Sequence, residues 1–81
     1  MEVENFMIKD HFKFLKSIQF RLNTGFNTFY MVGWENVQEI LLDSLDVNNI
    51  RVFIKYDGSN KKTVVNLSNT IDYTYEVVDN A

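Results

Sequence analysis

The chain has 81 residues, a hydrophobic content of 46% and a formal net charge of −3, so it is long enough for one small domain, residues 1–81, and for no more. It has no Cys, which excludes disulfides and thiolate chemistry and favours a reducing compartment. No signal-peptide pattern begins the chain, and no apolar run approaches the roughly 18 residues that a membrane span needs. We therefore expect a cytoplasmic protein with no membrane partner.

Apolar side chains recur at helical spacing along residues 5–23, and Gly25 provides a stop signal. This pattern predicts a long amphipathic helix. For residues 12–22 a strand stays open as the alternative, because three apolar residues alternate there and Thr24-Gly25 would then turn a hairpin into Phe26–Val32. The alternating residues are Ile18, Phe20 and Leu22.

The segment Phe26–Val32 is short and aromatic, which predicts a strand that Gly33 ends. Residues 35–46 then show helical spacing again, and we predict a second helix with Trp34 packed over its start. The inner face of this helix is expected to hold Val37, Ile40, Leu41 and Leu45.

From residue 50 onward the pattern is β. Apolar residues alternate along 50–56 and 71–77, and 63–67 returns between them after a strong turn signal at Asp57-Gly58-Ser59-Asn60. These three strands predict an antiparallel meander with helices on one face. The expected fold class is α+β, in the order α-β-α-β-β-β, with two helices packed on a small, mainly antiparallel sheet.

The sequence offers no set of residues for catalysis. His11 is the only His, and no metal-binding pattern accompanies it. The Ser residues stand outside any nucleophile motif, and the three Gly residues form no phosphate-binding loop. We expect no catalytic residues, no metal and no cofactor, and therefore no enzyme.

An acidic stripe is the most specific surface that the second predicted helix would carry. Acidic residues at this spacing fall within about one quadrant of a helix, and those near its C-terminus oppose the helix dipole. The stripe therefore indicates a protein partner with a basic surface, although a solvated face explains the charges too. Its members are Glu35, Glu39, Leu42, Asp43 and Asp46.

Two other surfaces are alternatives. The outer face of the first predicted helix would join basic side chains to an aromatic ring, as single-stranded nucleic acid requires, but the negative net charge disfavours nucleic acid. An uncovered sheet face with Phe53, Tyr73 and Tyr75 would instead serve a homodimer. The basic-aromatic set is Lys9, Lys13, Lys16, Phe20 and Arg21.

The leading hypothesis is a non-enzymatic protein-binding module. Its most specific form is a small phage or mobile-element protein that inhibits a host nucleic-acid-handling or defence factor in the host cytoplasm. Small size, the lack of catalytic motifs and the A/T-rich codons that Asn, Lys, Ile, Phe and Tyr imply support this form. The alternatives are a small nucleic-acid-binding or regulatory protein and a structural homo-oligomer subunit.

Overall fold

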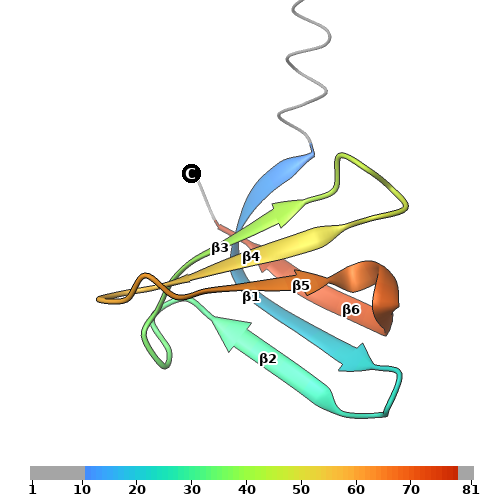
Figure 1. Cartoon of the computed structure of the whole chain (residues 1–81), viewed down its shortest axis with the longest axis horizontal. Coiled ribbons are helices and arrows are strands. Elements are labelled where there is room, and N and C mark those ends of the chain that lie inside the picture. Colours follow the sequence, from blue (N-terminus) through green and yellow to red (C-terminus); the bar gives the residue numbers. More distant parts are fainter. Residues whose placement is uncertain (1–10, 79–81) are drawn as a thin grey trace, which may run out of the picture.

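A computed structural model describes residues 11–78 as a curled, antiparallel β-sheet (Figure 1). A single 3₁₀ turn, η1 (Leu67–Asn69), precedes the last strand. The strands are β1 (Phe12–Leu22), β2 (Asn27–Met31), β3 (Val37–Asp43), β4 (Arg51–Tyr56), β5 (Lys62–Asn66) and β6 (Thr70–Val77).

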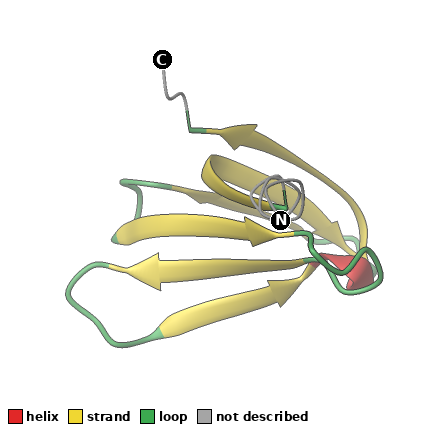
Figure 2. Cartoon of the chain, turned by 90° about the horizontal axis from the view of Figure 1, so that it is seen from above, coloured by secondary structure: helices red, strands yellow, loops and turns green. Residues whose placement is uncertain are grey.

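Strand β1 organises the sheet because it pairs along both of its edges. One edge pairs with β6, from Leu15 opposite Val77 to Leu22 opposite Thr70. The other edge pairs with β3 along Phe12–Leu15 and with β2 along the second half of the strand. Strand β4 adds to β3, and β5 adds to β4. The sheet curls into a half-barrel (Figures 1 and 2). The half-barrel is open, because β5 and β6 do not pair with each other.

The predicted α+β fold is wrong. Residues 11–78 contain no α-helix, and the described part of the first predicted helix is β1. The alternative for residues 12–22 is confirmed, because β1 turns at Gly25, where φ is 95°, into β2. Residues 35–46, the second predicted helix, contain the end of a turn, β3 and the start of a loop.

Two β-bulges explain why the apolar residues of β1 and β3 have a spacing that predicted helices. Lys16 is an extra residue in β1 between two successive pairs with β6, and Gln38 is an extra residue in β3 opposite β4. A bulge shifts the alternation of faces by one residue. Leu15 and Ile18 are therefore three residues apart yet both buried. The same shift in β3 buries Val37 and Ile40, and the combined spacing resembles the 3.6-residue period of a helix.

The core lies on the concave side of the curled sheet. Strands β1, β3 and β4 contribute the buried residues of the core. Partly buried side chains of β2 and β5, such as Tyr30 and Val65, pack against them. Leu67 of η1 joins this cluster at one end, and its N–H donates a hydrogen bond to the Ile50 carbonyl at 2.8 Å. The buried cluster is Leu15, Ile18, Phe20, Val37, Ile40, Leu42, Val52, Ile54 and Leu67.

The strands predicted from residue 50 onward are confirmed as strands β4, β5 and β6. Their predicted arrangement as one meander is wrong, because β6 does not return beside β5. Instead, η1 leads the chain away from β5, and β6 pairs with β1. This pairing joins distant parts of the sequence: Ser17 and Glu76, which are 59 residues apart, form a hydrogen bond. The core is therefore covered by the sheet itself and not by helices.

Candidate protein-interaction surface

The strand geometry separates the residues of the predicted acidic stripe. Glu35 lies in the turn before β3, and Asp46 lies in the loop after it, where its carboxylate accepts the Asn48 N–H at 3.0 Å. Leu42 is buried in the core. Of the five predicted residues, only Glu39 and Asp43 lie on the outer face of β3. The Asp43 carboxylate forms an ion pair with Arg51. Because residues 37–43 form a strand, the five residues do not lie on one face of a helix.

The basic-aromatic set is also separated. Lys9 lies outside the described residues. Phe20 is a buried core residue, so its ring is not available for stacking on a base. Arg21 forms an ion pair with Asp72 on the neighbouring strand. Lys16 is exposed at the β1 bulge, and Lys13 is half-buried.

The outer face of the sheet carries an apolar surface that the sequence analysis missed in part. Four side chains stand opposite one another across β1, β3, β4 and β5, on the face away from the core. The two at the ends are the most exposed, Phe14 at 54% and Val64 at 56%, while Leu41 and Phe53 are half-buried. We call this set, Phe14, Leu41, Phe53 and Val64, the outer row. Of these four residues, only Phe53 was predicted from the sequence to lie on an uncovered sheet face.

A polar row borders the outer row on one side. Arg51 stands opposite Asp43, and 3.2 Å separates its Nη2 from the Asp43 Oδ2. The Arg51 guanidinium also lies over the Phe53 ring, with 5.3 Å between Cζ and the ring centroid. This cation–π contact keeps the Phe53 ring against the sheet on the side of the ion pair.

A charged row borders the outer row on the other side. Glu39 of β3 stands opposite Lys55 of β4, and Lys55 stands opposite Lys62 of β5. All three side chains are exposed. Within residues 11–78, none of them forms an ion pair. The row therefore carries one carboxylate for two ammonium groups.

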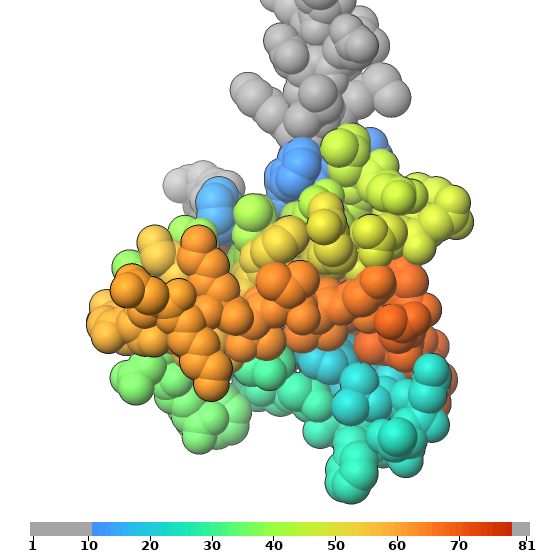
Figure 3. All heavy atoms as spheres, in the orientation of Figure 1, coloured from blue at the N-terminus to red at the C-terminus, as the bar shows by residue number. Residues whose placement is uncertain are grey.

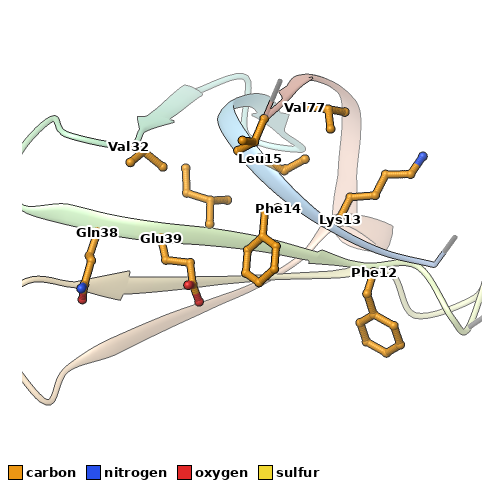
Figure 4. A pocket seen from close by; sticks show the side chains of 10 residues that line it. Phe12, Lys13, Phe14, Leu15, Val32, Gln38, Glu39 and Val77 are labelled. Carbon is orange, nitrogen blue, oxygen red and sulfur yellow. The ribbon is translucent and has the colours of Figure 1, made fainter. Parts of the chain in front are cut away.

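A pocket of about 480 Å³ opens at the Phe14 end of the outer row. Figure 4 shows Val32 and Val77 on one side of this pocket, with Phe14 and Glu39 on the other. Phe14 belongs to both features, so the apolar surface of the outer row continues into the pocket. Lys13 and Glu39 are the charged side chains of the lining, and they do not form an ion pair with each other.

Residues 11–78 contain no cluster of three or more His, Cys, Asp or Glu side chains that could hold a metal ion. His11 is half-buried, and its carbonyl accepts hydrogen bonds from Ser44. Burial, and then the neighbouring Tyr56, raise the pKa of Tyr30, which is partly buried against the core.

Within residues 11–78, no helix has the length and apolar character needed to cross a lipid bilayer. Comparisons with protein families, with curated proteins and with solved structures find no match for this chain.

Proposed function

We propose that the chain is a non-enzymatic protein-binding module whose partner docks on the outer row. The observation that carries this proposal is the alignment of four apolar side chains across four neighbouring strands, on the face away from the core. Single exposed apolar residues are ordinary on protein surfaces, but a contiguous apolar patch with a polar border is typical of an interaction site.

The border of the outer row adds to this support. The ion pair of Asp43 and Arg51 on one side and the charged row on the other supply a polar rim around an apolar centre, as in protein interfaces. The pocket at Phe14 would receive a bulky side chain of the partner, since anchors of interfaces fill such pockets.

The biological role that we propose is the inhibition of a host nucleic-acid-handling or defence factor by a small phage or mobile-element protein. This role is supported by the small size of the chain and by an amino-acid composition that A/T-rich codons produce. The acidic stripe adds nothing to it, because strand geometry disperses those side chains. The nucleic-acid alternative loses the aromatic member of its predicted surface, because Phe20 lies in the core.

Affinity capture with a matched control tests the docking surface. We expect the double variant Phe14→Ser/Val64→Ser to lose, by about tenfold or more, a protein that the wild type captures from a lysate of a low-GC bacterium. The control is Phe26→Ser/Val47→Ser, which removes one Phe and one Val that are both 73% exposed and lie in loops away from the outer row.

Quantitative mass spectrometry of the captured proteins is the readout, and thermal unfolding confirms that both double variants fold. A protein retained by the wild type and the control but lost by the outer-row variant supports the proposal. Identical capture profiles for all three proteins would overturn it.

A further inference from the structure

Strand β5 presents a free edge to the solvent. It pairs with β4 along one edge, and no described strand pairs with the other. In the space-filling view, the orange spheres of β5 run across the front of the molecule (Figure 3). A free edge exposes backbone N–H and C=O groups that an extended segment of another chain can pair with. The centre of this edge, Thr63–Val65, has no Pro, no charge and no bulge, so it remains able to pair.

Both the outer row and the charged row end at this edge. Val64 ends the outer row, and Lys62 ends the charged row. These residues are two positions apart, so their side chains lie on the same face of the strand. A strand added beside β5 would therefore extend both rows by one residue each.

The charged row is unbalanced at the same edge. Glu39 stands beside Lys55, but Lys62 faces only Lys55, and like charges directly opposite each other destabilise a strand pair. The missing counter-charge is thus on the open side of Lys62. An acidic side chain on an added strand would supply it.

We propose that an extended segment of the partner protein adds to the free edge of β5, with an apolar residue beside Val64 and an acidic residue, two positions away, beside Lys62. This inference rests on the proposed function, because it uses the end of the outer row as part of the docking surface. It identifies the partner by an acidic-apolar pattern on one face of a strand.

The other two free edges lack this combination. On the outer side of β6, Asp72 is paired with Arg21, and Glu76 accepts a hydrogen bond from Ser17. On β2, the Phe29 ring already packs against Trp34, with 5.8 Å between ring centroids. The outer face of β6 carries only polar side chains, Asp72, Thr74 and Glu76, and β2 has no charged residue. Of the free edges in residues 11–78, only β5 therefore places an exposed apolar residue and an unpaired charge together on the outer face.

A second copy of the chain satisfies the edge less well. If two β5 strands met about a two-fold axis with Val64 opposite Val64, Lys62 would face Asn66 of the other copy. The amide of Asn66 carries no charge, so Lys62 would still lack its counter-charge. The charge of the edge therefore favours a different, acidic segment.

Synthetic peptides test the pattern directly. The probes are three peptides of about nine residues in which Thr alternates with Val and a variable residue, which is Glu, Gln or Lys. Fluorescence anisotropy measures their binding to the full chain. We expect the Glu peptide to bind about tenfold more tightly than the Lys peptide, and Lys62→Glu to reverse this order. Lys61→Glu is the matched control, since it makes the same charge change in the turn before β5 and should keep the wild-type order.

Amide hydrogen exchange supplies a second readout. The Glu peptide should slow exchange in β5 and leave β2 unchanged. Equal binding of all three peptides, or an unchanged order in Lys62→Glu, would overturn the acidic pattern. Protection of β2 in place of β5 would overturn the position of the added strand.

The outcomes separate this inference from the proposed function. If the peptides bind equally and Val64→Ser abolishes their binding, the outer row still binds protein and only the acidic pattern is overturned. If the Glu peptide binds selectively and Phe14→Ser/Val64→Ser weakens peptide binding but leaves protein capture unchanged, the outer-row function fails and the added strand at β5 stands. A wild-type dimer in sedimentation that Val64→Ser dissociates would assign the edge to a second copy and overturn the inference.

Discussion

Asp43 and Arg51 form an ion pair across the ends of β3 and β4, with 3.2 Å between Oδ2 and Nη2. Asp43 is only 8% exposed, and its Oδ1 also accepts the Leu45 N–H at 3.1 Å, where the chain leaves β3. Arg51 in turn covers one side of the Phe53 ring. This pair therefore joins the end of a strand, the start of a loop and one border of the outer row.

We expect Asp43→Ala to lower the free energy of unfolding by about 2–3 kcal/mol. The substitution leaves the Leu45 N–H without its acceptor and the Arg51 guanidinium without its counter-charge, and both groups are partly buried. Urea denaturation measures the change. Asp72→Ala is the control, because it breaks the exposed pair with Arg21 and should cost less than about 1 kcal/mol. Equal losses in the two variants would contradict the structural role of Asp43.

Leu42 and Leu45 distinguish the observed strand from the predicted helix. We expect Leu42→Ala to cost about 2–5 kcal/mol, because Leu42 is a buried core residue and its truncation leaves a cavity. Leu45 is 53% exposed, so Leu45→Ala should change the free energy of unfolding by no more than about 0.5 kcal/mol. A helix over residues 35–46 would give the opposite order, with Leu45 on its inner face. Thermal or urea unfolding of the two variants decides between them.

The turn between β2 and β3 contains two neighbouring residues with left-handed backbone. Glu35 has φ of 52° and Asn36 has φ of 65°. Asn tolerates this region better than Glu, because its short side chain bonds locally to the backbone. We expect Glu35→Asn to raise the free energy of unfolding by about 0.5–1 kcal/mol, and the mirror variant Asn36→Glu to lower it by a similar amount. Changes of the same sign in both variants, measured by urea denaturation, would argue against this conformation.

The raised pKa of Tyr30 predicts a loss of stability at alkaline pH. Burial is the first cause of the shift, and the neighbouring Tyr56 adds to it. The neutral phenol is thus favoured in the folded state, and its stabilising effect is complete below the unfolded value of about 10. That effect is lost as the pH rises through the higher folded pKa.

Tyr30→Phe removes this titration. Its free energy of unfolding should therefore fall less steeply than that of the wild type above about pH 10. Urea denaturation at a series of pH values measures the slope. Parallel slopes for the variant and the wild type would show that Tyr30 is not the group responsible.

Local patterns were sufficient where a strand contains no bulge and a clear turn follows it. Val52 and Ile54 alternate with Arg51 and Phe53 throughout β4, and the Asp57–Asn60 turn leads directly into β5. The segment Phe26–Val32 was likewise predicted as a strand and contains β2. In these segments each side chain's face follows from its position in the sequence alone.

The sequence by itself thus determined the strands that follow residue 50, the strand within Phe26–Val32 and the hairpin alternative for residues 12–22. Only the tertiary structure decided between helix and strand for β1 and β3, because the extra residues Lys16 and Gln38 become recognisable as bulges only when the partner strands are paired. It also decided the candidate surface. Phe14, Leu41, Phe53 and Val64 come from four strands, and side chains that distant in sequence are aligned by hydrogen-bonded register alone.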